Sequence, residues 1–154
     1  MVVNADTEDR FELRALVERY AACCDRRRFV ELGSLFGAGG RLVVYRDGGA
    51  EVAGVRTGAD EIARVVGVGL GRYLGTGHMV GAHGAAVAPG GQTGSGETTC
   101  RAYHLYERDG ERRVMVMSIF YDDTYVREEG RWRFEERHVR TQWREDRPAG
   151  SWVP

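Results

Sequence analysis

The sequence predicts an α+β fold in which helices come first and a curved antiparallel sheet follows. Near the N-terminus, apolar residues recur at intervals of three and four, as on one face of a helix. Later in the chain, β-rich runs follow one another with short turns between them. The clearest pair is 115–127 and 131–139, joined by Glu128-Glu129-Gly130, which is a hairpin signal. Segregated helices and consecutive antiparallel strands indicate the α+β class.

Two helices are expected before the first strand. Asp6 or Thr7 can cap the first helix, with acidic residues in its first turn. Its apolar face would be formed by Leu13, Leu16, Val17, Tyr20, Ala21 and Cys24. A second, short helix is expected over about 27–36, and the glycine-rich stretch 37–40 would end it.

The rest of the chain alternates between β-rich runs and turns, with one more helix. We expect strands at 41–46 and 51–56, a helix at about 59–68, and strands at 78–88, 98–107, 113–127 and 131–142. The turn Asp47-Gly48-Gly49 would join the first two strands. Residues 89–96 read as an exposed glycine-rich loop, and the polar tail 144–154 as loosely held.

Composition limits the classes of function. At 154 residues the chain should form one domain over 1–154. The net charge is −1, from 22 basic and 23 acidic residues, so nothing favours nucleic-acid or anionic-membrane partners. All the basic residues are arginines, which leaves no lysine for a Schiff base. The three cysteines suggest neither a disulfide framework nor a zinc site. The first residues lack a signal-peptide pattern and no long apolar run occurs, so a cytoplasmic location is expected.

Two segments carry a resemblance to a known family. The segment Leu16-Val17-Glu18-Arg19-Tyr20-Ala21-Ala22-Cys23-Cys24-Asp25 and the later Gly130-Arg131-Trp132-Arg133-Phe134 together resemble a SnoaL-like domain of the NTF2-like superfamily. The resemblance covers roughly 8–143. It implies an NTF2-like cone, in which a curved antiparallel sheet is wrapped by N-terminal helices around one pocket. Relatives include polyketide cyclases, dehydratases acting on bile acids and scytalone, a dehydrochlorinase, steroid isomerases and epoxide hydrolases, besides members without known activity.

The resemblance implies that Asp25 pairs with the catalytic His78 and orients it, and that Tyr20 faces the same pocket. A neutral imidazole is the best general base in this chain, and a carboxylate on its other nitrogen would fix the tautomer. Each residue also has a structural interpretation: Asp25 could cap the second helix, Tyr20 could be core, and His78 could be a polar surface group. His83 is a weaker candidate, because five residues along a strand should turn it to the opposite face.

Three further residues are implied with less support. By the resemblance, His104 would donate a proton to a leaving hydroxyl or polarise a carbonyl, Tyr45 would help to hold the substrate carbonyl, and Arg137 would stabilise developing negative charge. The alternatives are a structural histidine, a packed aromatic ring and a solvated arginine. His138 competes with Arg137 for the inward-facing place.

The expected function is that of a cofactor-independent lyase or isomerase, a dehydratase or cyclase. It would act by His/Asp general acid–base catalysis on a hydrophobic, carbonyl-bearing small molecule, such as a polyketide, steroid or terpenoid intermediate. No metal, flavin or nucleotide is expected to be required. The alternative is a non-catalytic small-ligand-binding or assembly module. Catalysis requires the Asp25 and His78 side chains within about 3.2 Å, or one water apart, at one cavity.

Relatives usually form dimers or trimers through the outer face of the sheet. A homodimer or homotrimer is therefore expected, with Trp132, Trp143 and Tyr125 as candidate interface residues. Epoxide hydrolysis is a less favoured reaction, because no Asp-Arg-Asp group that holds a water can be assembled from the sequence.

Overall fold

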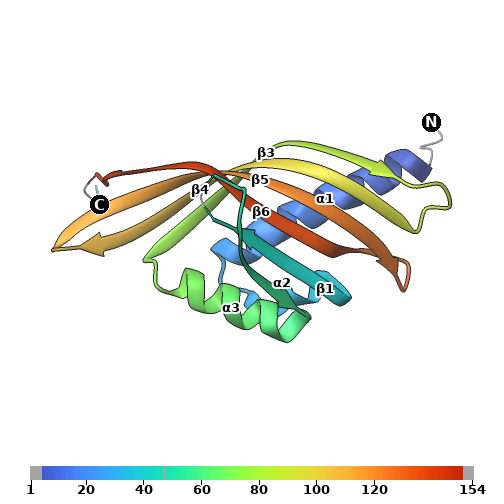
Figure 1. Cartoon of the computed structure of the whole chain (residues 1–154), viewed down its shortest axis with the longest axis horizontal. Coiled ribbons are helices and arrows are strands. Elements are labelled where there is room, and N and C mark those ends of the chain that lie inside the picture. The colour runs from blue at the N-terminus through green and yellow to red at the C-terminus, as the bar shows by residue number, and fades with distance from the viewer. Residues whose placement is uncertain (1–4, 47, 151–154) are drawn as a thin grey trace.

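The computed structural model describes residues 5–46 and 48–150 and confirms the predicted α+β class. The elements in chain order are α1 (Ala5–Asp25), α2 (Phe29–Ser34), β1 (Phe36–Tyr45), β2 (Val52–Thr57), α3 (Ala59–Gly71), β3 (Gly75–Val87), β4 (Thr93–Arg108), β5 (Glu111–Glu128) and β6 (Arg131–Pro148). In Figure 1, the long strands form one curved sheet, α1 lies along it, and α2 and α3 lie together below it. None of the described helices is long and apolar enough to cross a bilayer.

The six strands form a single sheet with the order β2-β1-β6-β5-β4-β3. All neighbouring strands are antiparallel except β1 and β6, which run parallel, with Leu42 opposite Arg137 and Val43 opposite His138. The expectation of an antiparallel sheet is therefore wrong for this one pair. The last strand, β6, lies between β1 and β5. It therefore joins the β1–β2 hairpin to the β3–β4–β5 part of the sheet.

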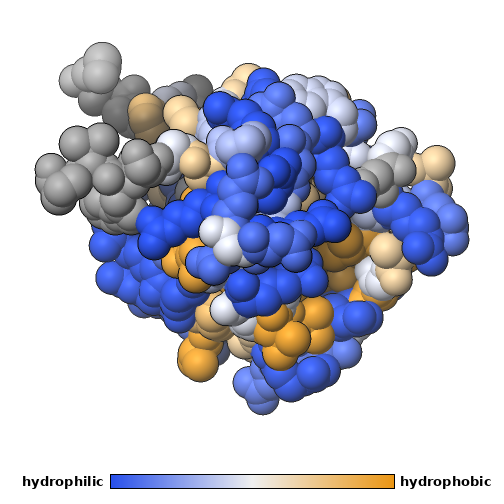
Figure 2. Space-filling model, turned by 90° about the vertical axis from the view of Figure 1, so that its left-hand side faces the viewer, coloured by the Kyte–Doolittle hydropathy of each residue, from blue (hydrophilic) through white to orange (hydrophobic). Residues whose placement is uncertain are grey.

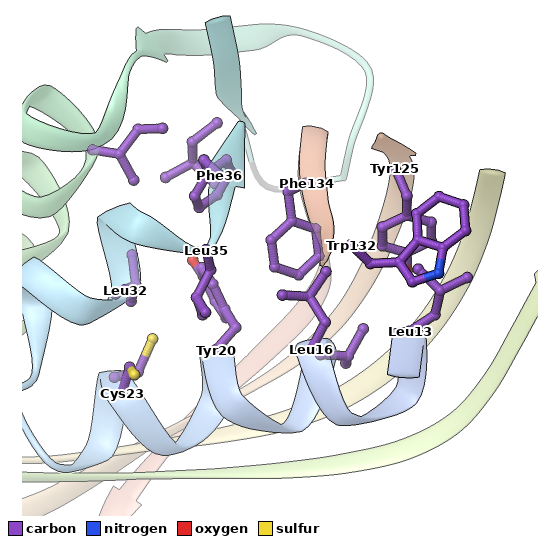
Figure 3. Packing of buried hydrophobic residues seen from close by; sticks show 14 residues of the cluster. Leu13, Leu16, Tyr20, Cys23, Leu32, Leu35, Phe36, Tyr125, Trp132 and Phe134 are labelled. Carbon is purple, nitrogen blue, oxygen red and sulfur yellow. The ribbon is translucent and has the colours of Figure 1, made fainter. Parts of the chain in front are cut away.

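The core lies between α1 and the concave face of the sheet (Figure 3). Along α1, Leu13, Leu16 and Tyr20 are almost fully buried, as their spacing predicts. They face a ladder of rings from the sheet, formed by Phe36, Tyr125, Trp132 and Phe134. Burial of each large side chain stabilises the fold by about 1.5–3 kcal/mol.

Two of the three residues expected at an oligomer interface lie in this core. Tyr125 is 0% exposed and Trp132 is 5% exposed, so neither offers a surface to a partner. Trp143, at 46%, remains exposed on β6, and the Arg101 guanidinium stacks on its ring. The sequence alone could not separate these aromatic residues, because alternation along a strand does not reveal which face a helix covers.

Strand pairing overrides several local turn signals. The glycine-rich stretch 37–40 belongs to β1 and does not end a helix. Residues 93–96 of the expected loop belong to β4, and residues 94–96 pair with 85–87 of β3. The prediction of a loosely held tail is wrong for residues 144–148, because they extend β6 along β5. Residues 151–154 of that tail lie outside the described part. Helix α1 begins at Ala5, before the expected caps, and Asp47 of the expected turn is not described.

An irregularity in β3 moves His83 to the face that carries His78. The register shifts between Val80 and His83, so that His78, Val80 and His83 pair with Ala102, Cys100 and Thr98 in turn. Those partners are spaced by two along β4 and share one face. The expectation that His83 points to the opposite face is therefore wrong, because the extra residue of a β-bulge changes the alternation.

Candidate active site

Asp25, the last residue of α1, and His78, near the start of β3, lie next to each other. The His78 Nδ1 lies 2.7 Å from the Asp25 Oδ1, and the His78 backbone N–H donates to the Asp25 Oδ2 at 2.8 Å. The Thr76 hydroxyl donates to the Asp25 Oδ1 at 3.0 Å. Three hydrogen bonds thus fix the carboxylate, and the carboxylate in turn fixes the imidazole, although the two residues are far apart in sequence.

The carboxylate is held in its ionised form. Partial burial alone would raise the pKa of Asp25, but the hydrogen bonds from His78 and Thr76 outweigh it and lower the pKa below its ordinary value. An ionised Asp25 accepts the Nδ1–H of His78, which leaves the Nε2 lone pair free. The His78 side chain is only 6% exposed, so its basic nitrogen is shielded from bulk water.

A cavity of about 370 Å³ opens beside His78, between α3 and the concave face of the sheet. Its apolar lining comes from Leu42, Val44, Val65, Val66, Leu70, Met115, Met117, Ile119 and Val139. The polar side chains at its wall include His78, His104, Tyr20 and Tyr121. Asp25 does not line this cavity, so the expectation that both side chains face one cavity is not met here. Both residues border a separate open groove beside α1, and only His78 also reaches the cavity. An apolar cavity of this size with a few polar groups is typical of a small-molecule site.

His104 lies at the cavity wall but is held as a neutral imidazole. Its ring centre is 5.9 Å from that of His78 and 4.7 Å from that of Tyr73. Burial, together with the nearby His78 and Arg72, lowers the pKa of His104 to about 4, against a hydrogen bond to the Met115 backbone that raises it. With that bond made, the Nδ1 is left buried without a partner. A group with this pKa carries no proton to give near pH 7.

Tyr20 and Tyr121 contribute two phenol side chains to the lining of the cavity. Burial raises the pKa of both phenols above the ordinary value, so both remain protonated hydrogen-bond donors. Their rings meet edge to face at 6.1 Å. Tyr20 was expected here, but Tyr121 was not. Its alternation with Asp122 along a β-rich run could not reveal which of the two faces inward.

Arg137 lies behind these rings and does not line the cavity. It is fully buried, donates from Nε and Nη2 to both oxygens of Asp123 at 2.9 and 2.8 Å, and places its Cζ 4.3 Å from the Tyr20 ring and 4.1 Å from the Tyr121 ring. Arg137, and not His138, was expected to face inward, and it does. It was also expected to face the pocket directly, and it does not. The rings of Tyr20 and Tyr121, which do line the cavity, are in contact with the guanidinium.

Tyr45 projects from the opposite face of the sheet. Its neighbours Leu42 and Val44 line the cavity, whereas the Tyr45 hydroxyl meets the His138 Nδ1 at 2.9 Å and its ring lies under Arg140. The substrate-binding role expected for Tyr45 does not fit this placement. The resemblance identified the strand but not the face.

Tyr73 was also missed by sequence reasoning, because it lies in the link between α3 and β3. Arg27 holds this link by donating to the backbone oxygens of Leu70 at 2.7 Å and Tyr73 at 3.1 Å. Arg27 has a positive φ of 59°, at the turn that follows α1. The turn that follows Asp25 thus also fixes the link whose Tyr73 ring packs on His104.

Other reactive groups do not add to the site. Cys24 lines the cavity, but burial raises its pKa to about 12, so it is not a thiolate at neutral pH. Among residues 5–46 and 48–150, no group of three or more His, Cys, Asp or Glu side chains is arranged to hold a metal ion.

Comparison with known proteins places the chain in a family. The model of the SnoaL-like domain matches residues 5–138. An uncharacterized protein of Mycobacterium tuberculosis (strain ATCC 25618 / H37Rv) is 28% identical over 133 residues, which cover 86% of this chain and 85% of that protein.

Solved structures share the fold. A putative scytalone dehydratase from Novosphingobium aromaticivorans has a TM-score of 0.72 at 22% identity, covering 93% of this chain and 90% of its own. The hexachlorocyclohexane dehydrochlorinase LinA-type3 from Novosphingobium barchaimii has a TM-score of 0.79 at 16% identity, covering 96% and 95%. The chain belongs to the SnoaL-like domain family and has the NTF2-like α+β fold.

Proposed function

We propose that this protein is a lyase or isomerase that removes a proton next to the carbonyl of a hydrophobic small molecule. The observation that carries the proposal is the 2.7 Å contact between Asp25 and His78, with the imidazole at the wall of an apolar cavity. The family and the fold shared with a dehydratase and a dehydrochlorinase support a reaction of the elimination type.

In the proposed step, His78 Nε2 takes the proton from the carbon next to the carbonyl. Asp25 stabilises the imidazolium that forms. For dehydration, the electron pair left on that carbon forms the double bond, and the hydroxyl on the next carbon departs. The imidazolium returns the proton to it, so that water leaves. General acid–base assistance of this kind contributes about 10²–10⁴-fold.

The negative charge that develops on the carbonyl oxygen needs hydrogen-bond donors. Tyr20 and Tyr121 are protonated and line the cavity, so they are the candidates for this role. Arg137 supports both rings from behind and acts as a positioning residue. His104 keeps its neutral state in this scheme, and one base serves both proton transfers.

Proton exchange at carbon tests the proposal without knowledge of the natural substrate. A panel of aromatic β-hydroxyketones would be incubated with the protein in D₂O, with NMR following deuterium uptake next to the carbonyl and absorbance following the conjugated enone. His78→Asn and Asp25→Asn should each slow both signals about 100-fold or more.

The matched control is His83→Asn, since His83 shares the strand and the face but lies outside the cavity. It should leave both rates near the wild-type value. Exchange that survives His78→Asn would refute the proposed base. Ketones that bind to the wild-type protein but never exchange would favour the ligand-binding alternative.

A further inference from the structure

One position in the α3 wall of the cavity carries no side chain. Val65, Gly69 and Tyr73 all line the cavity, and each lies four residues from the next, so they share one face of α3 and of the turn that follows it. A Cβ atom added to Gly69 would have no heavy atom within 4 Å. The wall therefore has a gap between Val65 and Tyr73, each of them about 6 Å from Gly69 along the helix axis.

Packing within the chain does not require glycine at this position. The preceding glycine of α3, Gly67, does have a steric reason, because a Cβ atom there would lie 3.1 Å from the Phe29 ring. Gly69 meets no such neighbour among the described residues. Glycine in a helix interior is less favourable than alanine, so the gap weakens α3 without improving its packing. Its use must lie in the cavity, where the space is open to a ligand.

The surroundings of the gap suit a flat ring. The Tyr73 ring forms one side of it, and the sheet contributes the thioethers of Met115 and Met117 to the same cavity. Aromatic rings and thioethers both make favourable contacts with an aromatic ligand. Figure 2, which faces the side where α3 ends and β3 begins, shows apolar patches set among hydrophilic side chains, so an apolar ligand would meet apolar surface on this side.

A line of rings connects the gap with the proposed base. The centre of the Tyr73 ring lies 4.7 Å from that of His104, which in turn lies 5.9 Å from that of His78. Gly69 is one helical turn beyond Tyr73, so it lies at the far end of this line from His78. A ligand that reaches both His78 and the gap must extend further than a single ring with its carbonyl group.

We infer that Gly69 is a specificity-determining residue of this cavity, which admits a ligand with two fused aromatic rings. The far ring would lie on the α3 backbone at Gly69 while the carbonyl-bearing end reaches His78. A flat ring can enter a gap that is one side chain wide, whereas a thicker saturated ring cannot. The inference rests on the proposed function for the reacting end, but binding of the far ring can be measured without turnover.

Two ketones that differ by one ring test the inference. Calorimetric titration would compare 2-acetylnaphthalene with acetophenone, which carries the same acetyl group on a single ring. The wild-type protein should bind the two-ring ketone at least about 10-fold more tightly, because the second ring is buried at the gap. Gly69→Ala should weaken binding of 2-acetylnaphthalene about 3–10-fold and Gly69→Leu more than about 10-fold. Both should leave acetophenone within about 2-fold of the wild-type affinity.

Gly71→Ala is the matched control, because Gly71 lies in the same helix with open space around an added methyl group but does not line the cavity. It should bind both ketones like the wild-type protein. Gly69→Ala should fold with an unchanged Tm or one raised by up to about 4 °C, since alanine favours the helix.

Three results would overturn the inference. One is a Gly69→Ala protein that binds 2-acetylnaphthalene like the wild type. The second is a Gly69→Ala protein that loses affinity for both ketones equally. The third concerns the flat ring: the acetyl derivative of decahydronaphthalene, a saturated two-ring analogue, should bind at least about 10-fold more weakly than 2-acetylnaphthalene, and equal binding would refute the aromatic assignment.

The proposed function fails on a different measurement. Both ketones carry protons next to the carbonyl, so deuterium uptake can be followed on the same compounds. His78→Asn should keep the preference for two rings while it abolishes the exchange. Gly69→Ala should raise the KM for exchange of 2-acetylnaphthalene and leave exchange of acetophenone unchanged. A protein that prefers two rings at Gly69 but exchanges protons without His78 has the ring site and lacks the proposed base.

Discussion

At the scale of single residues, the molecule contains two aspartate-centred pairs with different tasks. Asp25 and His78 pair beside a cavity and leave one imidazole nitrogen free. Asp123 and Arg137 pair inside the core through two hydrogen bonds, which leave the Arg137 Nη1 buried without a partner. The difference lies in the surroundings: an apolar cavity lies beside the first pair, and aromatic rings enclose the guanidinium of the second. Arg137 is therefore a structural support for Tyr20 and Tyr121.

This assignment predicts a strong effect of Arg137 on stability. Arg137→Met should lower the free energy of unfolding by about 3–5 kcal/mol, because it leaves the Asp123 carboxylate buried without its partner. The double variant Arg137→Met/Asp123→Leu should recover part of that loss. Urea denaturation of the wild-type protein, the single variant and the double variant would measure these free energies of unfolding. Additive losses would show that the two side chains do not depend on each other.

The sequence could predict the two ends of the proton-transfer pair but not its surroundings. The resemblance indicated Asp25 and His78, and their contact is present. Tyr121 and Arg144 were not identified as residues of the cavity lining. Their positions there depend on which face of β5 is covered and on how far β6 continues. Tyr45 was placed on the correct strand but on the wrong face for the cavity. Contacts between distant segments decide these points, and local patterns do not contain them.

At the scale of elements, α2 and α3 pack unusually closely at one glycine. A Cβ atom on Gly33 would lie 2.3 Å from the Ala59 backbone oxygen and 3.2 Å from the Ala63 Cβ. A backbone atom cannot move aside as a side-chain tip can, so any larger residue must push the two helices apart. Since α3 forms one wall of the cavity, this contact sets the position of that wall.

Gly33→Ala should therefore lower the free energy of unfolding by about 1–3 kcal/mol, the usual cost of overpacking. Gly71→Ala is a suitable control, because it lies in α3 with open space around the added methyl group and should be neutral or slightly stabilising. Thermal unfolding of both variants would test the expectation. A Gly33→Ala protein as stable as the control would contradict the close approach of the helices.

The elements themselves were predictable where the pattern was strong and the partner was local. The face of α1 and the β5–β6 hairpin follow from periodicity and from the Glu129-Gly130 turn, where both residues have positive φ values. The ends of β4 and β6 were not predictable. Glycine-rich and polar residues there are strand only because β3 and β5 offer hydrogen-bonding partners along their length.

At the scale of the whole molecule, buried imidazoles should make stability depend on pH. The pKa of His104 is lowered to about 4 from 6.5, and burial also lowers that of His83. Between pH 6.5 and about 4, the unfolded chain binds a proton at His104 and the folded protein does not. The free energy of unfolding should therefore fall as the pH is lowered through this range.

We expect a loss of about 1–3 kcal/mol between pH 7 and pH 4.5, measured by urea denaturation at several pH values. His104→Gln should give a shallower dependence, with His83 still contributing. Asp25 acts in a different range, because its lowered pKa makes its contribution disappear only below its ordinary value of 3.8. Parallel pH profiles for the two proteins would mean that His104 titrates equally in the folded and unfolded states.

The parallel pairing of β1 with β6 has a consequence for co-translational folding. Leu42 is translated 95 residues before Arg137, its neighbour across the sheet. The edge of β1 that pairs with β6 therefore stays unpaired on the nascent chain until β6 has been translated. Chaperones that bind nascent chains could bind this unpaired edge of β1. A ribosome stalled before β6 would carry a chain in which β1 and β5 both lack their shared neighbour.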